Sequence, residues 1–67
     1  MKLEDKIILN VKRLLKLKKL SQRYLAHCAG FSNQMVSYIL NKERKLNLNH
    51  VESFCKALDV EIFELII

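Results

Sequence analysis

The sequence predicts an all-α protein of five helices that forms one domain over residues 1–67. The chain contains no proline and a single glycine, so the residues that usually mark turns and strand ends are scarce. Apolar residues recur three and four positions apart, as on one face of a helix, and no segment alternates apolar and polar residues over the length of a strand. A chain of 67 residues has room for one small core.

The first helix is expected from about Leu3 to Leu17. Acidic side chains at its start and lysines at its end both suit the helix dipole. Its apolar face consists of Ile7, Ile8, Val11, Leu14 and Leu15.

Serine caps and one glycine predict the next two helices. Ser21 is a suitable N-cap for a helix over residues 22–29, and Ser32 for a helix from 33 to about 41. Between them, Gly30 supplies a position that adopts positive φ without steric cost. Residues 42–46 are basic, lack an apolar period and are expected to form a loop.

Two further helices complete the chain. Asn47 is expected to cap a helix over residues 48–58 that ends at Asp59. Its buried stripe is expected to contain Leu48, Val51, Phe54, Cys55 and Leu58. A short last helix, about residues 61–66, is expected to turn three side chains inward: Ile62, Phe63 and Leu65.

The net charge of +5 favours a polyanionic partner, either nucleic acid or an anionic membrane surface. A membrane role is not expected, because no apolar stretch is long enough to span a bilayer and the first helix needs its apolar face for the core. Cys28 and Cys55 form no C-x-x-C pair, and no secretion signal is recognisable, so reduced cysteines in the cytoplasm are expected.

Four residues together have the ligand number of a zinc site: His27, Cys28, His50 and Cys55. Neighbouring residues on a helix point about 100° apart, so His27 and Cys28 do not easily share one metal. We expect both cysteines to be small core residues near apolar stripes, with no metal and no cofactor. No nucleophile–base constellation or glycine-rich phosphate loop is present, so neither catalysis nor a small-molecule ligand is expected.

Residues 22–41 have the spacing of a helix-turn-helix unit. Ala26 is small where two helices crossing steeply approach each other, and Gly30 makes the turn. The small core between the two helices is then closed by Leu25, Ala29, Phe31, Val36 and Ile39. The remaining positions of the second of these helices are free to point outward.

Five blocks at matching spacing resemble the Cro/C1-type (XRE) helix-turn-helix family, which includes the lambdoid phage repressors. They are residues 20–22, 24–26, 30–32, 36–39 and 56–60, and the resemblance covers nearly the whole chain. It implies a lambda-repressor-like domain of five helices that binds double-stranded DNA. The third helix would enter the major groove, and the second would lie across the backbone.

The resemblance assigns base reading to the outward residues of the third helix: Asn33, Gln34, Ser37 and Tyr38. Amide side chains suit this role, because Asn and Gln bond adenine through N6 and N7. The helix contains no arginine, so contacts that favour A·T pairs are expected. Phosphate contacts are expected from Gln22, Arg23, Ser32, Asn41, Lys42, Arg44 and Lys45.

The sequence departs from the family pattern at two turns and one pair of positions. Many relatives have glycine where Lys19 and Lys42 stand, so left-handed turns there would strain each lysine by about 1 kcal/mol. The alternative is that these two loops are remodelled. Several phage repressors join the first and third helices by a buried Arg–Glu pair, where this chain has Leu15 and Leu40. An apolar pair replaces a buried ion pair without loss of stability.

These observations predict a cytoplasmic, sequence-specific transcriptional regulator, most simply a repressor. One recognition helix reads few bases, so a homodimer on a pseudo-palindromic operator is expected, with half-sites about 10 bp apart. The alternative is a protein-interaction module, such as an antitoxin, for which DNA binding is secondary.

Overall fold

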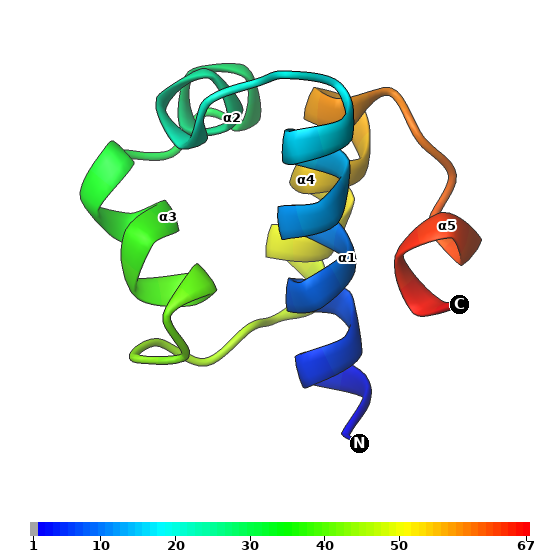
Figure 1. Cartoon of the computed structure of the whole chain (residues 1–67). Coiled ribbons are helices and arrows are strands. Elements are labelled where there is room, and N and C mark those ends of the chain that lie inside the picture. Colours follow the sequence, from blue (N-terminus) through cyan, green and yellow to red (C-terminus); the bar gives the residue numbers. More distant parts are fainter. Residues whose placement is uncertain (1) are drawn as a thin grey trace.

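The structure, a computed structural model, describes residues 2–67 and contains five α-helices (Figure 1). They are α1 (Leu3–Leu17), α2 (Gln22–Ala29), α3 (Asn33–Leu40), α4 (Leu48–Leu58) and α5 (Phe63–Ile66). Within residues 2–67 there is no β-strand. The all-α, five-helix prediction is therefore confirmed.

One core cluster receives side chains from all five helices and from Leu46 in the loop before α4. α1 packs against α3, α4 and α5, and α2 packs against α3 and α4. In Figure 1, α3 lies on one side of the α1–α4 pair and α5 lies on the other. The prediction of one domain agrees with this continuous core but stays a prediction.

The predicted caps of α2 and α3 are confirmed. The Ser21 hydroxyl accepts a hydrogen bond from the Tyr24 amide at 3.0 Å, and the Ser32 hydroxyl accepts one from the Met35 amide at 3.1 Å. Gly30 ends α2 with φ of 78° and ψ of 23°. Its left-handed conformation turns the chain toward α3, as the sequence predicts.

Asn47 caps α4 as predicted, and His50 completes a reciprocal cap that was not predicted. The Asn47 side chain accepts from the His50 amide at 2.9 Å, and the His50 Nδ1 accepts from the Asn47 amide at 3.2 Å. His50 is 4% exposed and meets the Phe31 ring edge-on, with centroids 5.4 Å apart. Burial and the nearby Arg44 charge lower the pKa of His50, so the neutral ring is favoured, which Nδ1 needs in order to accept.

Three non-glycine residues hold left-handed backbone conformations at the ends of helices. Lys19 has φ of 58°, Lys42 has φ of 63°, and Asp59 has φ of 56°. The two lysines are those expected to carry strain where relatives have glycine. The turns therefore keep their left-handed geometry rather than being remodelled.

Several expectations about helix ends and burial are wrong. α3 ends at Leu40 with Asn41 as its C-cap, and α5 begins at Phe63 rather than at residue 61. Leu48, Ile62 and Phe63 are exposed, by 67%, 47% and 57%. Leu48 is the first residue of α4, and α5 has a single turn, so only Leu65 reaches the core from α5.

Asn10 is a buried polar residue on the apolar side of α1, which the helical period does not predict. Its Nδ2 donates to the Leu65 carbonyl oxygen at 2.7 Å, and its Oδ1 accepts from the Arg13 guanidinium at 3.3 Å. The side chain thus joins the middle of α1 to α5. Leu15 and Leu40 are both buried in the core, consistent with an apolar pair in place of an ion pair.

No helix among the described residues is long and apolar enough to cross a membrane.

Candidate nucleic-acid interface

The packing between α2 and α3 fixes the direction in which α3 points. Leu25, Val36 and Ile39 are fully buried, and Ala26 is 2% exposed at the approach of the two helices. Phe31 and Ala29 are partly buried against this cluster. The Phe31 amide also donates to the Ala26 carbonyl at 2.9 Å, which closes the turn. The residues predicted to form the turn do so.

With that face buried, α3 presents a polar surface to solvent. Asn33, Gln34 and Tyr38 are exposed, and Ser37 is partly buried beside them. The predicted base-reading residues therefore share the outward side of one helix. α3 contains no charged residue, and its side chains can both donate and accept hydrogen bonds.

Two hydrogen bonds connect residues one turn apart on this surface. The Gln34 Nε2 donates to the Tyr38 hydroxyl at 2.8 Å. The Asn41 Nδ2 lies 3.4 Å from the Ser37 hydroxyl, a longer contact of the same kind. Sequence spacing contains the signal for both pairs, because residues four apart on a helix are neighbours.

The start of α2 and the turn carry the next group of predicted phosphate contacts. Gln22, the first residue of α2, is partly buried, and Arg23 beside it is exposed. Ser32 is exposed, and its hydroxyl still has a hydrogen to donate while its oxygen caps α3. α2 and α3 each begin near this group, and helix N-termini favour anions.

The loop between α3 and α4 carries Lys42, Arg44 and Lys45, which are all exposed. The amides of Glu43 and Arg44 both donate to the Tyr38 carbonyl, at 2.8 and 3.1 Å. These two hydrogen bonds to one carbonyl oxygen fix the basic loop to the last turn of α3. The arrangement was not visible in the sequence, because backbone bonds of a loop depend on its turn geometry.

The basic loop reaches the first turn of α1. Lys42 Nζ lies 3.1 Å from Asp5 Oδ1, an ion pair that the sequence pattern does not predict because the two residues lie far apart along the chain. A hollow of about 160 Å³ lies between the two segments. It is lined by Lys2, Glu4, Asp5, Ile8, Lys42, Arg44 and Lys45.

Charge is distributed unevenly along the chain. Lys56 is the single lysine or arginine after Lys45, whereas that part contains four acidic residues: Glu52, Asp59, Glu61 and Glu64. Most cations thus lie in α1, in the turn directly after it and in the loop after α3. The acidic residues are thus concentrated in the last third of the chain, and the basic residues in the part before it.

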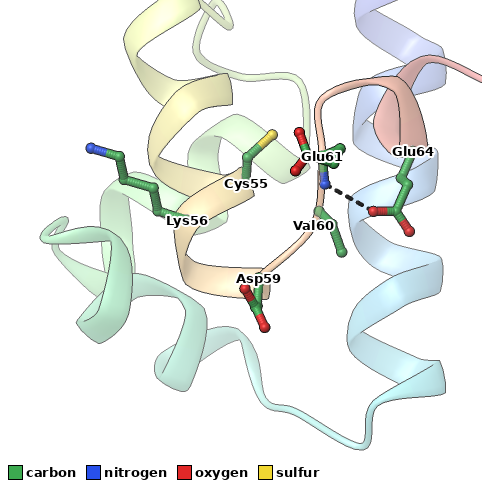
Figure 2. Close-up of a pocket in the computed structure, with 6 residues that line it drawn as sticks. All are labelled: Cys55, Lys56, Asp59, Val60, Glu61 and Glu64. Carbon is green, nitrogen blue, oxygen red and sulfur yellow. Dashed lines mark hydrogen bonds between the residues drawn. The ribbon is translucent and has the colours of Figure 1, made fainter.

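A hollow of about 280 Å³ lies where α4 leads into α5 (Figure 2). Figure 2 shows the carboxylates of Asp59, Glu61 and Glu64 around it, with the Cys55 thiol. Burial, followed by the charges of nearby glutamates, raises the pKa of Cys55, so the thiol stays protonated and poorly nucleophilic. The acidic side chains that line the hollow do not suit an anionic ligand.

The expectation that both cysteines are core residues is wrong for Cys28, which is exposed on α2. Interaction with the nearby Cys28 side chain raises the pKa of the Tyr24 phenol. Cys55 is partly buried. Among residues 2–67, no three histidine, cysteine or acidic side chains are grouped closely enough to hold a metal ion.

Comparisons with known proteins agree with this geometry. Residues 10–67 match the family model of the Cro/C1-type HTH DNA-binding domain. Among solved structures, the restriction-modification controller protein C.AhdI from Aeromonas hydrophila superposes with a TM-score of 0.83 at 29% sequence identity. The similarity covers 92% of this chain and 94% of that one. A search of curated proteins gave no significant match.

Proposed function

Because this chain belongs to the Cro/C1-type helix-turn-helix family, we propose that it regulates transcription by binding specific sites in double-stranded DNA. In this proposal α3 enters the major groove, and α2 lies across the phosphate backbone. The resemblance to a restriction-modification controller protein over almost the full length of both chains supports a regulatory role.

The observation that carries the proposal is the exposed polar side of α3 next to a basic loop. Asn33, Gln34, Ser37 and Tyr38 are the proposed base readers. The solvent side of α3 carries four uncharged hydrogen-bonding side chains, and exposed cations follow directly after the helix. Major-groove recognition needs both features, because base edges give specificity and phosphates give affinity.

The proposed phosphate contacts surround α3 on both sides. They are Gln22, Arg23, Ser32, Asn41, Lys42, Arg44 and Lys45. The cations among them supply the part of the affinity that does not depend on sequence and that falls as salt rises. Lys42 meets a phosphate only in competition with Asp5, because the two side chains already form an ion pair.

We propose that the protein binds its operator as a homodimer. A pseudo-palindromic site offers two half-sites about 10 bp apart, and two-fold symmetry places one α3 in each. The exposed apolar side chains of the last segment, Ile62, Phe63 and Ile66, supply a surface for the second copy. Sedimentation of the protein with and without operator DNA measures this, and a monomer in both states would refute it.

Repression is the simplest regulatory outcome, since a protein bound over a promoter competes with RNA polymerase for the same DNA. A regulator acts where the genome is accessible, so a cytoplasmic location belongs to the same proposal. A promoter fused to a reporter tests the sign of regulation. A rise of the reporter signal when the protein is expressed would show activation and contradict the proposed repression.

A salt titration with random-sequence duplex tests DNA binding itself. A DNA-binding protein loses affinity with a slope of about 0.9 per neutralised phosphate in a plot of log affinity against log salt. A protein-interaction module, the alternative, shows little affinity for the duplex even at low salt. The Gln34→Ala variant tests base reading. It should lose more affinity for a selected site than for random duplex, and equal losses would remove Gln34 from the reading set.

A further inference from the structure

Gln34 and Tyr38 form a pair on the outward side of α3. They are one helical turn apart, and the Gln34 amide nitrogen donates to the Tyr38 hydroxyl at 2.8 Å. Tyr38 is 41% exposed, so the bond lies at the surface that faces the DNA in the proposed complex. Both side chains therefore approach base edges as one connected unit.

This bond changes what the Gln34 amide offers to a base. A glutamine amide has two N–H donors and one oxygen acceptor. One N–H is occupied by the Tyr38 hydroxyl, which leaves one N–H and Oε1. In the major groove, adenine presents the acceptor N7 beside the donor N6, whereas guanine presents two acceptors, N7 and O6.

We propose that Tyr38 is a positioning residue that makes Gln34 prefer adenine over guanine. The remaining N–H and Oε1 of Gln34 match N7 and N6 of adenine. Guanine requires two donors from one amide group, and the second N–H is held by Tyr38. The inference rests on the proposed function, because it assumes that α3 reads bases in the major groove.

The hydroxyl also limits the rotation of the amide. The last torsion of glutamine is broad and roughly two-fold, so an unrestrained amide exchanges its nitrogen and oxygen easily. The bond to Tyr38 fixes the nitrogen on the Tyr38 side. The Tyr38 hydroxyl keeps its own hydrogen, which is free to donate to a phosphate oxygen. Loss of that hydrogen bond to phosphate lowers the affinity for all duplexes alike. The ratio of adenine to guanine at the position that Gln34 reads is therefore the decisive quantity.

The Tyr38→Phe variant removes this one hydroxyl and keeps the ring. Wild type, Tyr38→Phe and Gln34→Ala are each used to select duplexes from a library randomised over both half-sites. The position read by Gln34 is the one at which Gln34→Ala loses its preference. There, wild type should enrich adenine, and Tyr38→Phe should show an adenine-to-guanine ratio reduced by about three- to tenfold, the effect of one hydrogen bond.

A duplex carrying 7-deazaadenine at that position provides a second readout, because it lacks the N7 acceptor. Wild type should lose affinity on this substitution, and Tyr38→Phe should lose less. Tyr24→Phe is the matched control, since Tyr24 is an exposed tyrosine of α2 outside the proposed reading set. It should keep the wild-type ratio. Circular dichroism checks that each variant keeps its helices.

The results separate the inference from the function on which it rests. An unchanged adenine-to-guanine ratio in Tyr38→Phe overturns the inference, including when affinity falls equally for all duplexes. A wild-type preference at that position for a base other than adenine also overturns it. If wild type shows neither salt-dependent binding of random duplex nor enrichment of any sequence, the proposed function itself fails, and the inference fails with it.

Discussion

Lys42 Nζ lies 3.1 Å from Asp5 Oδ1, which joins the loop after α3 to the first turn of α1. The two side chains are 56% and 36% exposed, so water screens the pair and its contribution to stability is about 0–1 kcal/mol. Its larger effect is on the surface charge of the basic loop. Asp5 pairs with a cation that belongs to the proposed phosphate contacts.

The Asp5→Asn variant should therefore bind random-sequence duplex more tightly. We expect an increase of about two- to fivefold at low salt, which shrinks as salt rises. The salt slope should steepen by up to about 0.9, the value for one additional phosphate contact. Fluorescence anisotropy over a range of salt concentrations measures both quantities.

Glu52→Gln is the matched control for Asp5→Asn. It removes the same charge from an exposed position on α4 that forms no part of the basic loop. If both variants gain affinity equally, the effect is one of net charge, and the Lys42–Asp5 pair has no particular role.

Lys19 carries strain that a glycine would relieve. Its φ of 58° lies in the left-handed region, where a Cβ atom meets the carbonyl oxygen that follows. Lys19→Gly should stabilise the protein by about 1 kcal/mol in urea unfolding. Lys19→Ala removes the same charge but keeps the Cβ atom, so it should give no such gain. Equal gains in both variants would assign the effect to charge.

Gly30 is the converse case. A Cβ atom added there meets no heavy atom within 4 Å, so steric contact with neighbours does not oppose a larger residue. The φ of 78° remains unfavourable for any other residue type. Gly30→Ala should therefore cost about 1 kcal/mol of stability. A loss of 3 kcal/mol or more in urea unfolding would show that packing, rather than backbone conformation, determines this position.

Asn10 should be the polar residue of α1 that matters most for stability. Asn10→Ala leaves the Leu65 carbonyl without its partner and should cost about 1–3 kcal/mol. Hydrogen exchange should increase most in α5, because Asn10 is bonded to that helix. Asn49→Ala, at an exposed position of α4, should change stability by less than about 0.5 kcal/mol. Comparable losses in the two variants would contradict the proposed anchoring.

His50 should make stability depend on pH in the mildly acidic range. Burial and the Arg44 charge lower its pKa in the folded protein below 6.5, the ordinary value expected for the unfolded chain. Below pH 6.5 the unfolded chain takes up the proton first, so stability falls as the pH decreases toward the folded-state pKa. The contribution is fully present above pH 6.5.

His50→Gln tests this pH dependence. Glutamine at this position can still accept from the Asn47 amide, but it does not titrate. Thermal unfolding between pH 5 and 7 should show a weaker pH dependence in the variant than in wild type. If both proteins respond to pH alike, another group is responsible.

The turn and caps of the helix-turn-helix unit could be predicted from local sequence. Ser21, Ser32 and Asn47 cap helices because a short polar side chain reaches an amide three residues ahead, whatever the rest of the chain does. Gly30 is the one residue type that enters the left-handed turn at no steric cost. The helical period of apolar residues in α3 also predicted which polar side chains point outward.

Burial could be predicted less well. Leu48, Ile62 and Phe63 were expected inside and are exposed, whereas the polar Asn10 and His50 are buried. A helical period tells which residues share a side of one helix, but it does not tell how far a partner helix extends over that side. α5 has only four residues, so it presents one side to the core and leaves its other apolar side chains exposed.

The sequence by itself determined the helices, the turn at Gly30 and the residues that α3 turns outward, because each depends on contacts within about four residues. The tertiary structure decided what Lys42 contacts. Lys42 is 37 positions from Asp5 along the chain, and the two meet only because α1 packs against α3. Lys42 was expected to contact phosphate. The structure adds Asp5 as a competitor for the Lys42 ammonium group in the proposed complex.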